Sequence, residues 1–319
     1  MNTLSITIVV PIYNSETILN DVLSSLEKQK YPIEEIILID NNSKDTSFKI
    51  ASDYANISKF KVRAIRHKED RGLSYSYNEA IGLAKTSHLI TLQSDCLIMG
   101  EDDVKKLINP FYTDNVVVTC SLQTTPWQIW NKYNFWQKCL FSRHVGKILS
   151  GRNGRFCCFS IEALRKVGGY NEKTYRTAGE DGDILLRLGE IGEIKDVDIV
   201  VKHLHNNNSK FSFFDYLYKE NQLAEAVGAC LSVNIKKVKL RSLPTALARP
   251  IIVFGVFIPV INNIFFVIIF LYSIFFTKYV FLKKWKDIRI IILPFVNIFL
   301  LYSYTYYFLK GFLLKKQGL

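Results

Sequence analysis

Acidic residues follow two apolar stretches in the first part of the sequence. Asp40 comes directly after residues 36–39, and Asp95 follows residues 88–93 with one serine between. A carboxylate at the end of a buried strand loses hydration energy unless it meets a cation, a hydrogen-bond donor or open solvent. We interpret these positions as parts of a binding crevice, with a solvated strand-end carboxylate as the alternative for Asp95.

Phosphate binding is the chemistry that we expect in this crevice. A divalent cation on Asp95, helped by a basic group such as Arg71, would hold phosphate oxygens, because hard cations prefer oxygen ligands. The sequence has no GxGxxG turn after its first apolar stretch and no GxxxxGK[ST] motif. We therefore expect neither a dinucleotide-binding Rossmann site nor a P-loop.

The elements that would position these residues alternate between strand and helix patterns. Continuous apolar runs predict buried strands, and apolar residues at helical spacing predict helices between them. The predicted strands cover residues 4–10, where Pro11 ends the strand, 36–39, 62–65, 88–93 and 116–122. The predicted helices cover residues 19–26, 46–55 with Asp45 as the N-cap, 74–84 and 102–108. This order predicts an α/β fold with a mostly parallel, doubly wound sheet, whose ligands bind beyond the carboxyl ends of the strands.

The last part of the chain is more apolar than the rest. Residues 251–276 include no charged side chain, and residues 288–309 include only Arg289. As a helix, each run is long enough for a hydrocarbon core of roughly 30 Å. Because Pro259, Asn262 and Asn263 would break the first run into a re-entrant or interfacial hairpin, the topology stays open at this point.

The net charge of +12 arises partly from clusters at the ends of these runs. Such clusters fit anionic lipid headgroups, and no groove-reading motif supports nucleic acid as a partner. The clusters are Lys236, Lys237, Lys239, Arg241 and Arg249 before the first run, and Lys310, Lys315 and Lys316 after the second. Four lysines in the connector, between residues 278 and 286, oppose the positive-inside tendency if both runs cross fully.

The cysteines and the start of the chain indicate the cellular compartment in which the protein folds. The six cysteines have no CxxC spacing, and the chain opens without a secretory signal pattern. We expect a reducing cytosolic environment, cysteines that act as small core residues, and no zinc site.

Several segments together resemble the family 2 glycosyltransferases with the GT-A fold, over roughly residues 4–235. They are Ile8-Val9-Val10-Pro11-Ile12-Tyr13-Asn14, residues 38–46, Arg71-Gly72-Leu73-Ser74 with Asn78, and Gln93-Ser94-Asp95. The last stands where the family carries its DxD metal motif, with Gln93 in place of the first aspartate. Gly179-Glu180-Asp181, followed by residues 185–188, resembles the acidic pair that opens a helix beside the acceptor.

The resemblance implies a donor site, a metal site and a catalytic base. Asp95 and His203 would bind Mg²⁺ or Mn²⁺ on the donor diphosphate, and Asp181, next to Glu180, would be the general base for an acceptor hydroxyl. A helix cap is the alternative for the acidic pair, and an ordinary core or surface position is the alternative for His203. The implied donor-binding residues are Pro11, Tyr13, Asn14, Asp40, Arg71, Ser94 and Asp95.

Three further groups of residues lie near the implied site in sequence. His203 and His205 alternate, so both face one side of a strand. Arg152 and Arg155, in the glycine-containing loop 151–155, would hold the leaving nucleoside diphosphate or an anionic acceptor. For the aromatic residues of one predicted helical segment we expect packing or a membrane-facing surface rather than a sugar-stacking platform; they are Trp127, Trp130, Tyr133 and Trp136.

The predicted organisation is a GT-A catalytic domain at residues 1–235, a basic juxtamembrane segment at 236–250 and a membrane region with two hydrophobic helices at 251–319. We expect an integral membrane protein with a cytoplasmic catalytic domain, a UDP- or GDP-sugar donor, and a membrane lipid or lipid-linked glycan as acceptor. The expected reaction is a single inverting displacement onto a hydroxyl of a polyprenyl-linked glycan.

Two other functions remain open from the sequence. A polyprenyl-phosphate glycosyltransferase of the dolichol-phosphate-mannose-synthase type also joins this kind of domain to membrane helices. A membrane-anchored nucleotide-sugar-binding protein without catalysis would fit the Gln93 replacement. A processive polysaccharide synthase is disfavoured, because no QxxRW element follows the acidic pair between residues 185 and 242.

Overall fold

The structure is a computed structural model that describes the chain except for residues 1–2, 113–114, 206–209, 238–242, 285 and 319. The described residues form two compact units. The sheet unit comprises residues 1–132, 144–172 and 180–207, and the helical unit comprises residues 133–143, 173–179 and 208–319. The domain boundaries at residues 235 and 250 stay predictions.

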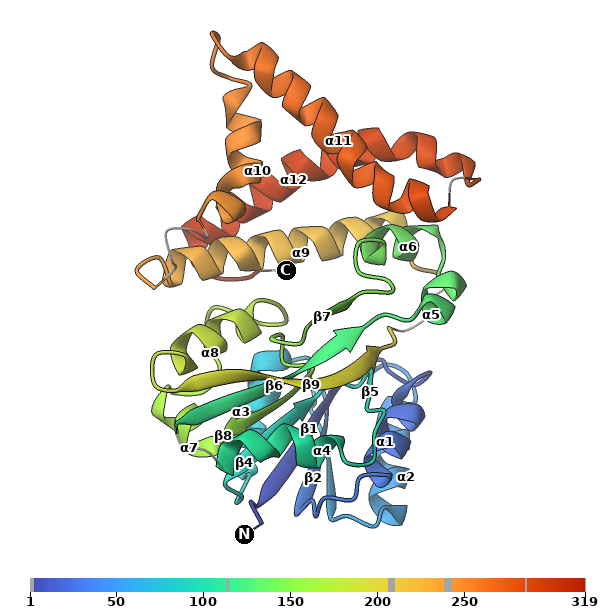
Figure 1. Cartoon of the computed structure of the whole chain (residues 1–319), viewed down its shortest axis with the longest axis vertical. Coiled ribbons are helices and arrows are strands. Elements are labelled where there is room, and N and C mark those ends of the chain that lie inside the picture. Colours follow the sequence, from blue (N-terminus) through green and yellow to red (C-terminus); the bar gives the residue numbers. More distant parts are fainter. Residues whose placement is uncertain (1–2, 113–114, 206–209, 238–242, 285, 319) are drawn as a thin grey trace. The chain divides into compact units, whose positions relative to one another are not determined.

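A sheet of nine strands forms the centre of the sheet unit, in the order β3-β2-β1-β4-β8-β6-β9-β5 with β7 paired to β6 (Figure 1). β3, β2, β1 and β4 are parallel to one another, which confirms the parallel sheet predicted for the first part of the chain. The strands are β1 (Ile6–Ile12), β2 (Glu35–Asp40), β3 (Val62–Arg66), β4 (His88–Leu92), β5 (Cys96–Leu97), β6 (Val116–Thr124), β7 (Ile148–Ser150), β8 (Phe156–Ser160) and β9 (Glu193–His203).

Antiparallel pairing extends the sheet on one side of these parallel strands. β8 lies between β4 and β6 and is antiparallel to both. β6 and β9 are parallel, whereas β5 is antiparallel to β9. The strand predicted at residues 116–122 is therefore present, but β8, from later in the chain, separates it from β4.

Helices cover both faces of the sheet, which explains why its strands have continuous apolar runs. Ile8 and Val10 belong to one core, and Val9 between them belongs to the other. The first core includes α1 (Leu19–Glu27), α2 (Ser47–Ile57) and α4 (Asp103–Ile108), and the second includes α3 (Leu73–Leu83), α7 (Ile161–Lys166) and α8 (Glu180–Leu188). The 3-10 turn η1 (Asn109–Tyr112) follows α4, and α5 (Trp127–Lys132) follows β6.

Several predicted boundaries differ from the structure by one or two residues. The first strand continues to Ile12 instead of ending before Pro11. A proline, which has no N–H, is tolerated there because β4 pairs with β1 only as far as Val9. The N-cap of α2 is Thr46 rather than Asp45, although the Asp45 carboxylate still accepts a hydrogen bond of 3.0 Å from the Ser47 N–H.

The helical unit contains the apolar part of the chain. The run predicted at residues 251–276 is interrupted, because α10 ends at Gly255 and α11 begins at Asn262, with Pro259 between them. The predicted break is confirmed. The helices of this unit are α6 (Phe135–Phe141), α9 (Phe213–Val233), α10 (Leu243–Gly255), α11 (Asn262–Lys284), the 3-10 turn η3 (Ile288–Ile292) and α12 (Leu293–Leu314).

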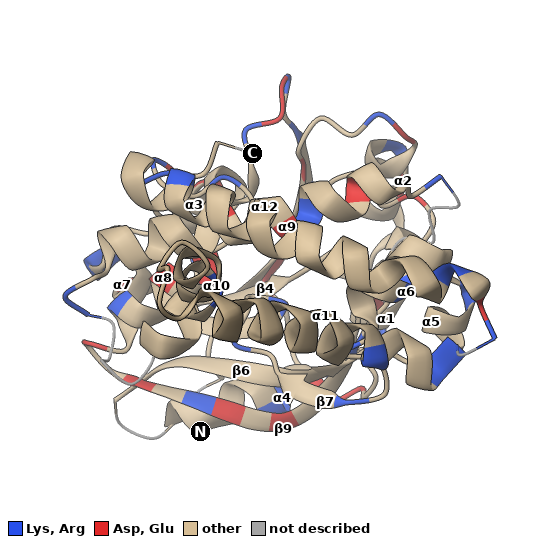
Figure 2. Ribbon diagram, turned by 90° about the horizontal axis from the view of Figure 1, so that it is seen from above, with Lys and Arg blue, Asp and Glu red and all other residues tan. Residues whose placement is uncertain are grey.

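Two helices of this unit are long and apolar enough to cross a membrane. Asn262–Lys284 has 23 residues with a mean hydropathy of 2.2, and Ile288–Leu314 has 27 residues with a mean hydropathy of 1.7. Figure 2 shows α11 without charged residues along most of its length. By length and composition, both helices satisfy the requirement for a membrane span.

α9 and α12 approach each other closely because glycines stand where their backbones meet. A Cβ atom on Gly228 would overlap the carbonyl oxygen of Phe308, and one on Gly311 would overlap that of Glu225. The Glu225 side chain is fully buried and pairs with Lys310 Nζ at 2.7 Å. The two helices are thus joined by an ion pair as well as by packing.

Two expectations about side chains need correction. The aromatic segment forms two helices instead of one, because α5 ends at Lys132 and Asn134 caps α6 by accepting a hydrogen bond from the Gln137 N–H. Trp130 is fully buried, as expected of a packing residue. None of the six cysteines, all within the described residues, forms a disulfide; five are buried, but Cys230 is partly exposed and is not a core residue.

Candidate active site

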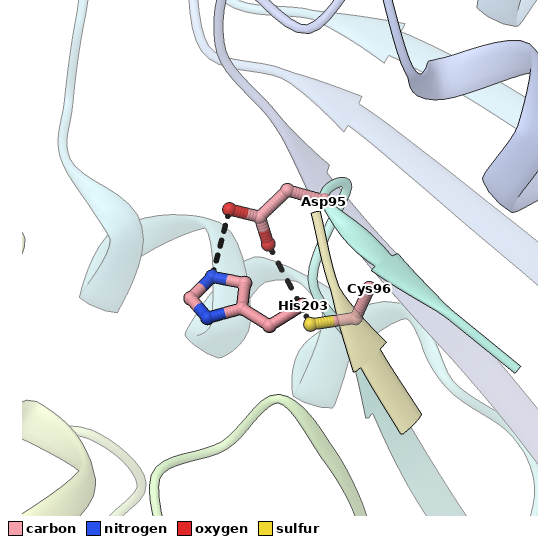
Figure 3. Close-up of side chains that lie close together, drawn as sticks. All are labelled: Asp95, Cys96 and His203. Atoms are coloured by element: carbon pink, nitrogen blue, oxygen red, sulfur yellow. Dashed lines mark hydrogen bonds and ion pairs between the residues drawn. The ribbon is translucent and has the colours of Figure 1, made fainter. Parts of the chain in front are cut away.

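The turn after β4 brings Asp95 to His203, the last residue of β9, and to His205, which lies beyond the strand with a φ of +45° instead of sharing a strand face with His203 as predicted. β5 pairs antiparallel with β9, with Cys96 opposite His203. Asp95 Oδ2 lies 3.1 Å from His203 Nε2 (Figure 3) and 3.7 Å from His205 Nδ1. The Leu204 N–H donates to the Asp95 carbonyl at 2.8 Å, so main-chain hydrogen bonds hold the two segments together.

The charges around Asp95 keep its side chain ionised. Burial alone would raise the pKa of the Asp95 carboxyl, but His203, His205 and Arg155 hold it well below its usual range. Burial lowers the pKa of His203, although Asp95 opposes this effect. At neutral pH the pair is therefore a carboxylate and a neutral imidazole.

This pair fits a divalent cation. Asp95, Cys96 and His203 each place a possible ligand atom within 4.8 Å of the others. Carboxylate oxygens suit Mg²⁺ and Mn²⁺, and neutral imidazole is a common metal ligand. Burial raises the pKa of the Cys96 thiol well above its usual value, so Cys96 stays protonated and is a poor ligand.

The acidic pair forms the first turn of α8, and Asp181 lies directly against Gly154. Gly154 has a φ of +68°, and a Cβ atom there would overlap Asp181 Oδ1. This Oδ1 is buried and has no hydrogen-bond partner among the residues that the structure describes. The glycine thus leaves room for a carboxylate oxygen that can accept a proton.

The two carboxyl groups of this pair have different protonation states. Burial raises the pKa of Asp181 to about 6, while Arg155 and a hydrogen bond with Glu180 oppose the rise. Burial and the neighbouring Asp181 raise the pKa of Glu180 well above its usual value. Glu180 is therefore the protonated member at neutral pH, and Asp181 is the ionised one.

Arg155 acts electrostatically on both groups. It lowers the pKa of Asp95 and of Asp181. One end of its guanidinium donates to Gln123 Oε1, and its Nε is buried without a partner in the described part of the chain. Arg152 instead donates to Asp196 Oδ1 at 2.8 Å, so the structure does not bring it to the group around Asp95 and Asp181.

The Gln93 main chain is tied to the same arginine, because its N–H donates to the Arg155 carbonyl at 2.9 Å. Burial raises the pKa of the Tyr77 hydroxyl well above its usual value, and the nearby charges of Asp181 and Glu180 add to this effect. The Tyr77 ring stacks on Tyr170 at 4.8 Å between centroids. These tyrosines are site residues that the sequence did not predict: periodicity indicates that Tyr77 faces the sheet, and no local signal marks Tyr170.

Asp40, at the end of β2, is buried with one oxygen paired and the other without a partner. Its Oδ2 accepts from the Ser43 N–H at 3.1 Å and lies 3.4 Å from Arg66 Nε. Its Oδ1 is buried and has no hydrogen-bond partner among the described residues. An unpaired carboxylate oxygen of this kind fits a ligand that donates a hydrogen bond.

The remaining predicted donor residues lie in the neighbouring loops. Asn14, with a φ of +48°, donates its N–H to Ser43 Oγ at 2.9 Å, next to Asp40. Ser94 Oγ lies 2.8 Å from Ser15 Oγ, which links the loop after β4 to the loop after β1. Tyr13 is 53% exposed, whereas Pro11 is buried inside β1.

Arg71 is oriented by an aromatic ring and by the loop after β2. Its N–H donates to Asn41 Oδ1 at 2.8 Å. Its guanidinium carbon lies 3.5 Å from the centroid of the Tyr75 ring. The arginine thus lies beside the segment that contains Asp40.

Comparison with known proteins identifies the family. The model of glycosyl transferase family 2 matches residues 7–167, half of the chain, and the chain belongs to this family. The sequence is 24% identical over 229 residues to the O-antigen chain rhamnosyltransferase RfbN of Salmonella typhimurium, covering 67% of this chain and 70% of that protein. It is 29% identical over 210 residues to the uncharacterized glycosyltransferase YfnE of Bacillus subtilis, covering 63% of this chain and 51% of that protein.

Two further relatives bear on the acceptor and the fold. A UDP-N-acetylglucosamine–dolichyl-phosphate N-acetylglucosaminyltransferase of Methanococcus voltae is 29% identical over 124 residues, covering 34% of this chain and 47% of that protein. A mannosyltransferase from Pyrobaculum calidifontis, solved with GDP-Man and Mn²⁺, is similar in structure with a TM-score of 0.56 at 13% identity, covering 100% of this chain and 88% of that one. The structural similarity confirms the GT-A fold.

Proposed function

We propose that the protein is a membrane-held glycosyltransferase that moves a sugar from a UDP- or GDP-sugar to a hydroxyl of a lipid-linked glycan. Asp181 carries this proposal, because its pKa is raised to about 6 and its Oδ1 has no partner among the described residues. A hydroxyl acceptor needs such a base, since an alcohol is a poor nucleophile until its proton is removed.

The proposed reaction is one displacement with inversion at the anomeric carbon. Asp181 accepts the proton of the acceptor hydroxyl while the hydroxyl oxygen bonds to the anomeric carbon. The bond from that carbon to the diphosphate oxygen breaks, and its electron pair leaves with the nucleoside diphosphate. Arg155 stabilises the negative charge that develops near it, and neutral Glu180 keeps Asp181 as the only ionised carboxylate of the pair.

The donor is held by the loops after β1, β2 and β4. Asp40 Oδ1 accepts a hydrogen bond from the nucleobase, and Arg71 and Ser94 contact the rest of the donor, with Pro11, Tyr13 and Asn14 lining the site. Mg²⁺ or Mn²⁺ on Asp95 and His203 would supply charge neutralisation at the diphosphate. Arg152, which pairs with Asp196, has no role in this proposal.

The apolar helices and the relatives support a glycan held in the membrane as the acceptor. α11 and α12 would cross the membrane and keep the sheet unit on the cytoplasmic side, where nucleotide sugars are available. A relative named for O-antigen chain rhamnosyl transfer supports a glycan rather than a small soluble acceptor.

Donor turnover tests the proposal. Full-length protein in lipid, with Mg²⁺ or Mn²⁺, is given a panel of UDP- and GDP-sugars and either polyprenyl phosphate or a lipid-linked glycan extract, with Asp181→Asn as the matched variant. We expect transfer to the glycan alone and its loss in Asp181→Asn. Nucleotide-sugar binding without turnover on any acceptor would contradict the proposal and favour a binding protein.

A second candidate is transfer to a polyprenyl phosphate. The similarity to a dolichyl-phosphate N-acetylglucosaminyltransferase favours it. A phosphate acceptor is already an anion and needs no general base, so transfer to polyprenyl phosphate that survives in Asp181→Asn would select this second function.

A further inference from the structure

The helical unit contains a polar pocket among its otherwise apolar helices. Its walls come from the end of α6 and from α9, α10, α11 and α12. Two arginines, Arg143 and Arg249, are among the residues that line it. Both guanidinium groups approach the same ring of α11: their carbons lie 4.8 Å and 5.9 Å from the centroid of Phe276. The two arginines therefore lie around one aromatic ring and line one pocket.

Positive charge exceeds negative charge in this pocket. Glu220 is its one acidic lining residue, and its Oε1 is 3.9 Å from a guanidinium nitrogen of Arg143, a long and weak ion pair. No carboxylate pairs with Arg249 anywhere in the described part of the chain; its guanidinium lies instead 4.1 Å from the centroid of the Tyr304 ring. An aromatic face compensates a cation only weakly, so the pocket lacks a counter-charge.

Phosphate is the anion that this arrangement suits. The planar guanidinium binds phosphate oxygens through paired hydrogen bonds, and it is the most common cation for this purpose in partly buried sites. Tyr216 and Tyr272 also line the pocket. Asn297 adds no donor, because its amide N–H groups already donate to the Ser273 carbonyl at 3.1 Å and to Thr277 Oγ1 at 2.9 Å.

The surroundings favour a lipid as the source of the phosphate. Phe276 belongs to α11, whose outer surface exposes large apolar side chains such as Phe270 (61%), Leu271 (58%) and Ile274 (45%). A hydrocarbon tail attached to a phosphate in the pocket would find apolar surface on the same helix. A free phosphate would gain nothing from it.

We propose that this pocket binds the phosphate group of a membrane lipid, with Arg143 and Arg249 as its ligands. The proposal rests on the proposed function in one respect, the insertion of this unit into a membrane. It adds a lipid-phosphate site built entirely from the helical unit, separate from the residues around Asp95 and Asp181.

Binding by the full-length protein in detergent tests this proposal. The probes are farnesyl diphosphate, dioleoyl phosphatidic acid, inorganic pyrophosphate and farnesol, each measured with saturating UDP and GDP so that the nucleotide site is filled. We expect the two lipids with phosphate to bind at least about tenfold more tightly than pyrophosphate or farnesol. Whichever lipid binds more tightly names the source, an isoprenoid or a glycerolipid, and either result supports a lipid-phosphate site.

Substitutions in the pocket should change the lipid affinity in opposite directions. Arg143→Gln and Arg249→Gln should each weaken lipid binding at least about tenfold, and Arg143→Lys should weaken it less. Glu220→Gln should strengthen binding, because it removes the carboxylate that competes for Arg143. The matched control is Arg289→Gln, in the same unit, where the arginine is already paired with Asp287 at 2.7 Å and lies outside the pocket.

Two results would overturn the proposal. One is equal lipid binding by the wild type and by Arg143→Gln, Arg249→Gln and Glu220→Gln, each with the melting temperature of the wild type. The other is pyrophosphate binding as tight as that of farnesyl diphosphate, which would make the site one for a free anion. Because Asp181→Asn should bind the lipids like the wild type, loss of sugar transfer and loss of lipid binding are distinguishable.

Discussion

Gly154 is placed so close to Asp181 that any side chain on the glycine would overlap the carboxylate. The glycine has a φ of +68°, and it lies in the loop that also contains Arg155, so one turn sets both the space and the charge around the proposed base. We expect Gly154→Ala to lose at least about tenfold in transfer rate, because the methyl group displaces the Asp181 carboxylate from the position where it meets the acceptor.

Gly168→Ala is the matched control for backbone strain. Gly168 has a φ of +80° but no atom within 4 Å of an added Cβ. Each substitution should cost about 1–2 kcal/mol of stability from the positive φ, and only Gly154→Ala should lose transfer beyond its loss of stability. Thermal unfolding and transfer rates measured on both variants check this, and equal activity in the two would remove Gly154 from the site.

The rate should depend on pH through Asp181. With the pKa raised to about 6, Asp181 loses its ability to accept a proton as the pH falls through that value. We expect the transfer rate at saturating donor to be constant above about pH 7 and to decline tenfold per pH unit well below 6. Rates at controlled ionic strength between pH 5 and 8.5 measure this profile, and a flat profile would argue against a general base.

Asp181→Asn should be more stable than the wild type at neutral pH. The folded protein binds the Asp181 proton more tightly than the unfolded chain does, because the pKa rises from 3.8 to about 6 on folding. This contribution to stability is present below the unfolded pKa and is lost as the pH rises through the folded one. Asparagine cannot ionise, so the variant's advantage should grow by on the order of 2 kcal/mol between pH 4 and 6.

Unfolding free energies of both proteins at pH 4 and at pH 7.5 would reveal this difference. A variant that is inactive and also less stable at pH 7.5 would indicate a structural role for Asp181. A variant that is inactive and as stable as the wild type, or more stable, would indicate a chemical one.

Metal binding should depend on Asp95 and His203 and not on Cys96. Saturating Mn²⁺ or Mg²⁺ should stabilise the wild type, by about 2.7 kcal/mol at a hundred times the dissociation constant. Asp95→Asn and His203→Phe should lose most of this gain, whereas Cys96→Ala should keep it, because hard cations do not need the thiol. His88→Phe, a buried histidine of β4 outside the group, is the control; the same loss in this variant would mean general destabilisation.

The parallel strands and the residues after them could be predicted because their signals are local. β1, β2 and β4 are buried along their whole length and are mostly apolar, and Asp40 and Asp95 stand where such runs end. The approach of His203 to Asp95 was predictable only through the family resemblance. It depends on the pairing of β5 with β9, more than a hundred residues apart in the chain, and nothing in either strand specifies that partner.

The helical unit contains more that the sequence conceals. Glu225 looks like a solvated residue of a polar helix, yet it is fully buried and paired with Lys310 of an apolar helix. Arg249 looks like an ordinary basic residue before a membrane run, and Arg143 lies far from both runs in the sequence. Only the packing around Phe276 brings the two together. Local patterns report which residues are apolar, but not which charges are enclosed with them.

Gln317, in the segment after α12, holds the loop that leads into α8. Its Oε1 accepts hydrogen bonds from the main-chain N–H groups of Arg176 and Thr177 at 3.0 Å and of Ala178 at 3.3 Å. The main-chain N–H of Gln317 donates to the Thr174 carbonyl at 2.7 Å, a bond that does not depend on the side chain. Because Gln317 is only 8% exposed, water replaces the three bonds to its Oε1 poorly if the side chain is removed.

Gln317→Ala should therefore destabilise the helical unit by about 1–3 kcal/mol, the usual result of leaving buried N–H groups without an acceptor. Gln317→Glu keeps an oxygen acceptor at the same place and should lose less. Thermal unfolding of the full-length variants in the same detergent compares them. Equal stability of Gln317→Ala and the wild type would show that the loop at residues 174–178 does not need this side chain. A greater loss of stability in Gln317→Glu than in Gln317→Ala would show that this buried position tolerates a missing acceptor better than a second negative charge near Glu225.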